Sequence, residues 1–171
     1  MKRPSRVREA GADDRDAIRA VTLAAYQQYA AEIPTLWETY RRNILATLAR
    51  PAPAAQIVAE DAGTLSGAVL LYPAGTDMSV PGGASMRRRW PEVRLLAVAP
   101  AARGRGVGAA LMQECVHRAR GSGADALSLH TTDMMRVAVR LYERMGFVRA
   151  PELDFQPAPG LTIKGYRLDL T

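Results

Sequence analysis

The sequence has very little of the residue types that build disulfides and zinc sites. Its 171 residues include one cysteine, Cys115, and two histidines, His117 and His130. A single cysteine excludes an internal disulfide, and so few nitrogen and sulfur ligands argue against zinc. We therefore expect no metal, although a site built from carboxylates alone stays open.

Long hydrophobic runs are also missing. No stretch approaches the length of a membrane-spanning helix, and the charged first fourteen residues lack the apolar core of a signal sequence. We therefore expect a soluble, cytoplasmic protein. With 48% hydrophobic residues the chain can still bury a core, and its length fits one domain.

Lysine is nearly absent, since Lys2 and Lys164 are the only two, and the net charge of +6 therefore comes from arginine. This charge suits an anionic ligand. An arginine-rich and alanine-rich composition can equally reflect genomic base composition, so the charge alone decides nothing.

Short β-like runs alternate with helical patterns, which favours a mixed α/β domain without internal repeats. Helices are expected from Asp13, from Pro34, over residues 107–120, and from Thr132 or Asp133 up to Gly146. Residues 73–90 are expected to form a loop. Strands are expected at residues 5–11, 56–60, 64–72, 92–99, 125–130, 147–155 and 161–170, with a hairpin turn at 61–63.

The segment between the expected strand 92–99 and the expected helix 107–120 is rich in glycine and arginine. Its sequence is VAPAARGRGVGAALM, residues 98–112. A strand that enters a glycine-rich turn and then a helix points several backbone N–H groups at one place, where the helix dipole also attracts phosphate. We interpret the segment as an anion site; the alternative is an ordinary turn with solvated arginines.

Three phosphate-binding patterns compete for this segment. The Walker A pattern is excluded because no lysine lies near it. Residues 104–109 satisfy the dinucleotide pattern G-x-G-x-x-G/A, which also needs an acidic residue at the end of the next strand. The candidate for that residue, Asp125, precedes the expected strand instead of ending it, and too little chain follows for a doubly wound sheet. The third pattern, Q/R-x-x-G-x-G/A, fits residues 103–108.

This third pattern resembles the coenzyme A pyrophosphate loop of the GNAT superfamily of N-acetyltransferases. A second motif, RLYERMGF at residues 140–147, is similar to the family's L-Y-x-K/R-x-G-F helix ending. One helix and one strand separate the motifs, as in the family. The resemblance implies a single GNAT-like domain over residues 1–171, of α/β (α+β) class, with a mixed central sheet of about seven strands flanked by about four helices.

The resemblance assigns the binding of acetyl-CoA, the co-substrate, to two sets of residues. In that family the strand before the loop separates from its neighbour, and its backbone holds the pantetheine arm; the matching positions are Leu96, Ala97 and Val98. The loop amides bind the pyrophosphate. The loop residues so assigned are Arg103, Gly104, Arg105, Gly106, Val107, Gly108 and Ala109.

The resemblance also implies catalytic roles. Tyr142 matches the general acid that protonates the departing thiolate. His130 lies where some members carry a glutamate as general base, with Glu92 and Asp133 as rivals. Met135 departs from the family, which often has an asparagine there to contact the coenzyme.

Acceptor specificity in the family usually comes from the first two helices and their loops. Four aromatic residues are expected there, although helical spacing equally predicts core packing: Tyr26, Tyr29, Trp37 and Tyr40. The basic run RRRW, residues 87–90, has two possible roles. It contacts the nucleotide phosphate or an acidic acceptor, or it is solvated; we expect it to be solvated.

The resulting hypothesis is an N-acetyltransferase that moves an acetyl group from acetyl-CoA to a primary amine of a small molecule, by direct attack on the thioester. A protein or peptide amine as acceptor, and a catalytically idle acyl-CoA-binding regulatory module, stay open as alternatives. We expect neither nucleic acid nor a membrane as partner, and the resemblance is compatible with a homodimer.

Overall fold

A computed structural model describes residues 5–79 and 85–171. Contacts divide the chain into two compact units. Unit 1 comprises Met1–Leu71 and Leu95–Glu114, and unit 2 comprises Tyr72–Arg94 and Cys115–Thr171. The strand β6 (Glu92–Val98) and the helix α3 (Val107–Gly121) each contribute residues to both units.

Unit 1 contains the antiparallel strands β1 (Arg6–Glu9), β2 (Ala55–Asp61) and β3 (Thr64–Tyr72, except its last residue). The β2–β3 turn places Ala62 at φ 48° and Gly63 at φ 81°. Two successive residues with positive φ match the right-handed twist of a hairpin. The predicted edge strand and hairpin are therefore confirmed.

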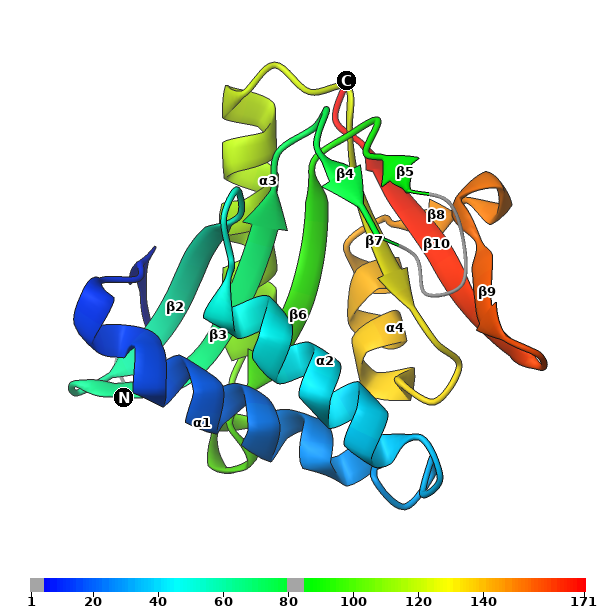
Figure 1. Cartoon of the computed structure of the whole chain (residues 1–171). Coiled ribbons are helices and arrows are strands. Elements are labelled where there is room, and N and C mark those ends of the chain that lie inside the picture. Colours follow the sequence, from blue (N-terminus) through cyan, green and yellow to red (C-terminus); the bar gives the residue numbers. More distant parts are fainter. Residues whose placement is uncertain (1–4, 80–84) are drawn as a thin grey trace. The chain divides into compact units, whose positions relative to one another are not determined.

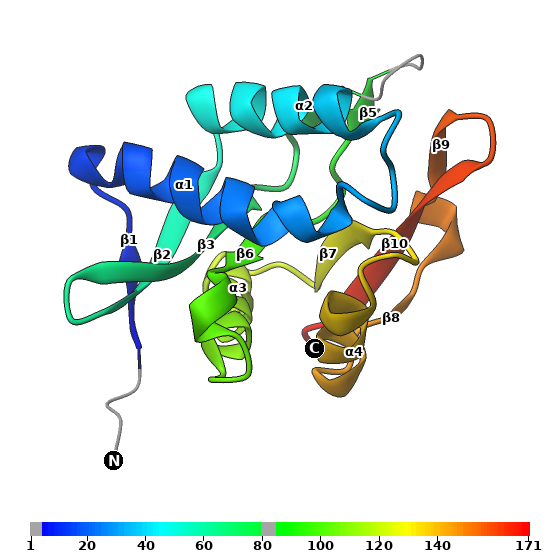
Figure 2. The same cartoon turned by 90° about the horizontal axis from the view of Figure 1, so that it is seen from below.

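Two helices, α1 (Arg15–Tyr26) and α2 (Trp37–Ala49), lie side by side over one face of β2 and β3 (Figure 1), while α3 begins on the other face (Figure 2). The start of α1 differs from the expectation. Asp14, not Asp13, accepts a hydrogen bond from the Gly11 amide at 2.7 Å, and its carboxylate also binds Arg8 at 2.6 Å. A short 3₁₀ turn over Ala12–Asp14 consequently precedes the helix.

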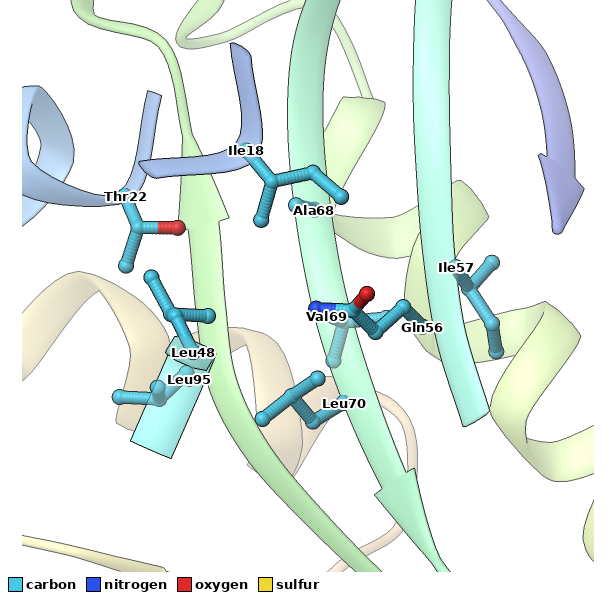
Figure 3. Close-up of a pocket in the computed structure, with 9 residues that line it drawn as sticks. All are labelled: Ile18, Thr22, Leu48, Gln56, Ile57, Ala68, Val69, Leu70 and Leu95. Carbon is cyan, nitrogen blue, oxygen red and sulfur yellow. The ribbon is translucent and has the colours of Figure 1, made fainter. Parts of the chain in front are cut away.

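The core of unit 1 is filled with apolar side chains from α1, α2, β2, β3 and the unit's part of β6. Figure 3 shows Ile18, Leu48, Val69 and Leu95 converging there. The gap between these side chains has no room for a water molecule. It is therefore packed core and not a ligand site.

Unit 2 is built around β10 (Leu161–Asp169), which pairs antiparallel with β7 (Ala126–Thr131), β8 (Val148–Arg149) and β9 (Phe155–Ala158). The first residues of β6 pair in parallel with β7. Across the chain the strand order is β1-β2-β3-β6-β7-β10-β8, with β9 pairing to β10 off this path. The predicted mixed sheet of seven strands with four helices is confirmed.

Three expectations for unit 2 need correction. The expected loop 73–90 contains a short hairpin of β4 (Asp77–Met78) and β5 (Met86–Arg87), with residues 80–84 outside the described part. The expected strand 147–155 is interrupted by a 3₁₀ turn at Pro151–Leu153. The helix α4 (Arg136–Arg144) starts after Met135.

The late start of α4 has a physical reason. The Asp133 carboxylate, expected to cap the helix, binds the Lys164 ammonium on β10 at 2.7 Å. It is therefore engaged elsewhere, and the cap residue Met135 offers no side-chain hydrogen bond to the first turn.

At 15 residues α3 is the longest helix, and neither it nor another helix within the described ranges combines enough length and apolarity to cross a membrane.

Gly67 on β3 tests the packing of unit 1. A Cβ atom there would lie 2.8 Å from the Ala97 carbonyl oxygen and 2.9 Å from side-chain carbons of Val107 and Leu111. We expect Gly67→Ala to reduce the free energy of unfolding by about 1–3 kcal/mol, because backbone and buried side chains must shift. Urea denaturation measures this change.

The matched control for that variant is Gly121→Ala at the end of α3, where no atom lies within 4 Å of the added Cβ. We expect its unfolding free energy to stay within about 0.5 kcal/mol of the wild-type value. Equal effects of the two substitutions would contradict the packing described for Gly67.

Candidate active site

The glycine-rich loop of unit 1 follows β6 directly. The Ala99 amide donates to Ser66 O at 2.8 Å, and a 3₁₀ turn over Pro100–Ala102 leads into the loop. Gly104 and Gly106 have φ values of 72° and 80°, which other residues adopt only with strain. A Cβ on either glycine would meet nothing within 4 Å, so backbone conformation and not lack of space requires glycine here.

The backbone N–H groups of this loop fit a phosphate group. Within the described residues, the amides of Gly104, Arg105 and Gly106 donate to no backbone oxygen, and helix α3 starts immediately afterwards at Val107. The first amides of a helix lack acceptors inside the helix, and its dipole is positive at that end. The loop thus presents free donors and positive charge together, as pyrophosphate binding requires.

The two arginines of the loop contact protein atoms. Arg103 donates through Nη2 to Ala25 O near the end of α1 at 3.2 Å, and Arg105 lies 3.2 Å from Asp61 on β2. Both residues are nevertheless exposed at the surface. To contact a phosphate, each arginine would have to give up this contact with the protein. The phosphate contacts of both arginines stay a prediction.

Leu95, in the middle of β6, is a residue that sequence reasoning missed. Its φ of 51° is a strained conformation for a leucine inside a strand. The parallel pairs of β6 with β7 are Glu92 with Ser128 and Val93 with Leu129, both before this point. The residues that follow Leu95 are Leu96, Ala97 and Val98, which are predicted to hold the pantetheine arm.

In unit 2, Glu92 is the centre of a buried network. Its carboxylate accepts a hydrogen bond from Arg88 Nε at 3.1 Å and lies 2.8 Å from His130 Nδ1. The side chains of Glu92 and Arg88 are only 2% and 4% exposed. Arg88 also donates to Asp77 O at 2.8 Å and lies 4.2 Å above the Tyr72 ring. The expectation of a solvated basic run is therefore wrong for Arg88.

His130 has acceptors on both sides of its ring. Nδ1 faces the Glu92 carboxylate, and Nε2 lies 2.9 Å from Leu153 O. A carbonyl oxygen can only accept, so Nε2 carries a hydrogen in this arrangement. A neutral ring with its hydrogen on Nε2 leaves Nδ1 free to take up a proton, and the adjacent Glu92 carboxylate then accepts a hydrogen bond from it.

The pKa of Glu92 reflects opposing influences. Burial raises the pKa, but the hydrogen bond from His130 and the charges of His130, Arg88 and Arg94 outweigh it, leaving the pKa below its usual 4.5. Glu92 is thus held ionised. A carboxylate so stabilised and so poorly exposed is a weak proton acceptor.

The other predicted catalytic positions lie around α4 in unit 2. Tyr142 is 6% exposed, and its ring lies 5.9 Å from Phe147. Met135 stands before the first turn of α4, where its sulfur accepts a hydrogen bond from Thr131 Oγ1 at 3.5 Å. Asp133 is highly exposed and paired with Lys164. The catalytic roles of Tyr142, His130, Glu92 and Asp133 stay predictions.

The four aromatic residues expected on the acceptor side form a cluster in unit 1. The Tyr26 ring lies 5.8 Å from Tyr29 and 6.1 Å from Tyr40, which is 6.2 Å from Trp37. Three of the four are buried, and Tyr40 is the more accessible member. Burial raises the pKa of Tyr29, partly offset by the charge of Arg103.

In the described ranges, no group of three or more histidine, cysteine or acidic residues could hold a metal ion.

Glu92→Gln tests whether the network carries buried charge. We expect the unfolding free energy to fall by about 3–5 kcal/mol, because the substitution leaves the Arg88 guanidinium buried without its counter-charge. Asp133→Asn, the same change at an exposed ion pair, should cost less than about 1 kcal/mol. Chemical denaturation of both variants measures these values, and a Glu92→Gln cost as small as the control's would refute the network.

The dependence of the unfolding free energy on pH in the acid range is a second measurement for Glu92→Gln. Because the pKa of Glu92 is lowered in the folded chain, its stabilisation is complete above 4.5 and is lost as pH falls through the folded value. The difference in stability between wild type and variant should therefore shrink from about pH 6 to about pH 3. A difference independent of pH would show that Glu92 does not titrate in this way.

Solved structures share this architecture. An acetyltransferase of the GNAT family from Staphylococcus aureus superposes with a TM-score of 0.72 at 14% identity, covering 98% of this chain and 99% of the other. A GNAT family acetyltransferase from Brucella melitensis, solved in complex with acetyl-CoA, superposes with a TM-score of 0.60 at 25% identity, covering 98% and 88%.

Sequence comparisons agree. A mycothiol acetyltransferase from Thermomonospora curvata is 38% identical over 69 residues, which span 40% of this chain and 23% of that relative. The model of the acetyltransferase (GNAT) family matches residues 18–147, which include the loop and the RLYERMGF motif. With this match across most of its length, the chain belongs to the GNAT acetyltransferase family, a family of acyltransferase enzymes.

Proposed function

We propose that this chain transfers an acetyl group from acetyl-CoA to the primary amine of a small molecule. The observation that carries the proposal is the loop of unit 1, in which two left-handed glycines and the start of α3 leave backbone amides free for a pyrophosphate. The acetyl-CoA complex of the relative from Brucella melitensis supports this choice of ligand.

The proposed binding residues act mainly through their backbones. The amides of residues 104–109 hold the pyrophosphate, with Arg103 and Arg105 adding charge if they exchange their protein contacts. The peptide groups of Leu96, Ala97 and Val98, which follow the left-handed Leu95, orient the pantetheine arm and polarise the thioester carbonyl. Acetyl-CoA supplies the activated acetyl group.

The proposed proton transfers use residues of unit 2. A neutral amine attacks the thioester carbon, and the Tyr142 hydroxyl gives its proton to the departing sulfur. His130 is the proposed acceptor of the amine proton, which it takes up on Nδ1 directly or through water, and the Glu92 carboxylate then accepts a hydrogen bond from the protonated ring. Glu92 itself, the weaker proton acceptor, is the rival for this role.

One observation favours a second function, a binding module without turnover. Met135 replaces the asparagine that the resemblance expects, and its thioether is engaged with Thr131. A thioether is a weak hydrogen-bonding group, so this position offers less to a coenzyme than an amide would. Loss of coenzyme contacts from α4 would be consistent with a protein that senses acyl-CoA.

Coenzyme binding is tested by Gly106→Val, read by isothermal titration with acetyl-CoA. A β-branched residue strongly disfavours the φ of 80° at this position, which would misdirect the loop amides. We expect affinity to fall at least about tenfold while the unfolding free energy changes by less than about 3 kcal/mol. Gly63→Val, at φ 81° in the β2–β3 turn, is the control for strain alone and should leave affinity unchanged.

Turnover is tested by Tyr142→Phe, assayed as thiol release from acetyl-CoA with a panel of amines. Removing the proposed acid should lower kcat about 100-fold or more, with little effect on acetyl-CoA affinity. Turnover of peptide amines alone would move the acceptor to a protein. Binding of acetyl-CoA without turnover of any amine by the wild type would instead favour the sensor.

A further inference from the structure

The surroundings of Glu92 in unit 2 hold more positive than negative charge. Its carboxylate is shared by Arg88 and His130, at 3.1 and 2.8 Å. Arg94 lies two residues further along β6, so its side chain leaves the same face of the strand as that of Glu92. Two arginines therefore accompany one carboxylate, even before the His130 ring is counted.

Other acidic groups of unit 2 do not compensate this excess. Asp154 is bound by the two terminal guanidinium nitrogens of Arg149, Nη1 and Nη2, at 2.9 and 2.7 Å. Asp77 is exposed, and its carboxylate lies 3.8 Å from Arg87 Nη1. Each of these carboxylates already has an arginine of its own.

Arg94 differs from Arg88 in having no acceptor. Among the residues that the structure describes, it makes no hydrogen bond and no ion pair, although it is partly buried. Its guanidinium lies 5.9 Å from the centre of the Tyr72 ring, which also carries Arg88 at 4.2 Å. The aromatic ring stabilises the cation without using its N–H donors.

These features describe a prepared anion receptor. A guanidinium held against a ring loses less freedom on binding than a mobile one, and its planar fork matches carboxylate and phosphate oxygens. Glu92 interacts with Arg94 through its charge alone, with no hydrogen bond or ion pair between the two described side chains, while its oxygens contact Arg88 and His130. An external anion would satisfy the free donors and reduce the local excess of charge.

We propose that Arg94 binds an anionic group, a carboxylate or a phosphate, on the amine acceptor. The inference rests on the proposed acetyltransferase function and narrows its substrate class. Arg94 is then a specificity-determining residue for the acceptor, and Tyr72 is the residue that positions it. The acceptors of this chain are zwitterionic amines and not polyamines, whose second cation the same arginines would repel.

The experiment compares three amines that share an aminoethyl group: β-alanine with a carboxylate, O-phosphoethanolamine with a phosphate, and neutral ethanolamine. For the wild type we expect kcat/KM to be higher for at least one anionic amine than for ethanolamine. Arg94→Gln should lower that value about 10- to 100-fold, mainly through KM, and change the value for ethanolamine less than about twofold. Arg94→Lys should recover part of the loss.

Arg87→Gln is the matched control, since Arg87 lies in the same unit and its side chain is 72% exposed. It should leave all three values unchanged. The proposal would be overturned if Arg94→Gln weakened the binding of acetyl-CoA instead of the binding of the acceptor. It would also be overturned if the substitution lowered kcat/KM equally for charged and neutral amines.

A direct binding measurement separates this proposal from the function on which it rests. In the protein saturated with coenzyme A, the NMR signal of the Arg94 Nε–H group should shift on addition of β-alanine or O-phosphoethanolamine, and not with ethanolamine. A shift without turnover would retain the receptor and reject the transferase. Turnover of ethanolamine at least as fast as both anionic amines, with no shift, would retain the transferase and reject the receptor.

Discussion

The ionised carboxylate of Glu92, 2% exposed, is the constraint around which unit 2 is organised. A buried charge must be paired, and this one draws Arg88 from the residues before β6 and His130 from β7 to the same place. Through His130 the network reaches Leu153, the last residue of the 3₁₀ turn between β8 and β9. One carboxylate thus ties three separate stretches of the chain together.

In unit 1 the corresponding constraint is conformational. Gly104 and Gly106 hold the loop in left-handed conformations that keep its amides from pairing with the chain itself. Leu95 adopts the same left-handed region within β6, where a leucine is strained and a glycine is not, at the position where the chain passes from one unit to the other. Strain of this kind persists only where surrounding structure enforces it, and it concentrates at functional positions.

The sequence allowed the order of elements, the hairpin of unit 1 and the loop to be predicted, because each has a local signal. Gly63 marks the turn, and the glycines at 104 and 106 mark the loop. Leu95 could not be predicted, since leucine has no preference for positive φ and only tertiary packing can impose it. The burial of Arg88 was equally hidden, because its partners Glu92 and Asp77 O are set by tertiary structure and not by spacing.

The prediction of where α4 starts failed for a related reason. Asp133 is a good capping residue by type, but its pairing with Lys164, 31 residues away, decides its role. Long-range ion pairs of this sort carry no signature in a local window. The same limit applies to His130, whose position on β7 was predicted while the two acceptors that occupy its ring were not.

The net charge of +6 can now be considered arginine by arginine. Arg8 is paired with Asp14 and Glu60, and Arg149 with Asp154, so these residues serve the fold whatever the origin of the arginine-rich composition. Arg105 is paired with Asp61 but belongs to the loop proposed to bind the pyrophosphate. Arg94 is different, because its partly buried guanidinium makes no hydrogen bond or ion pair with the residues that the structure describes. Composition explains why the residue type is common here, but it does not explain why this arginine makes no hydrogen bond or ion pair although it lies two residues from the buried carboxylate of Glu92.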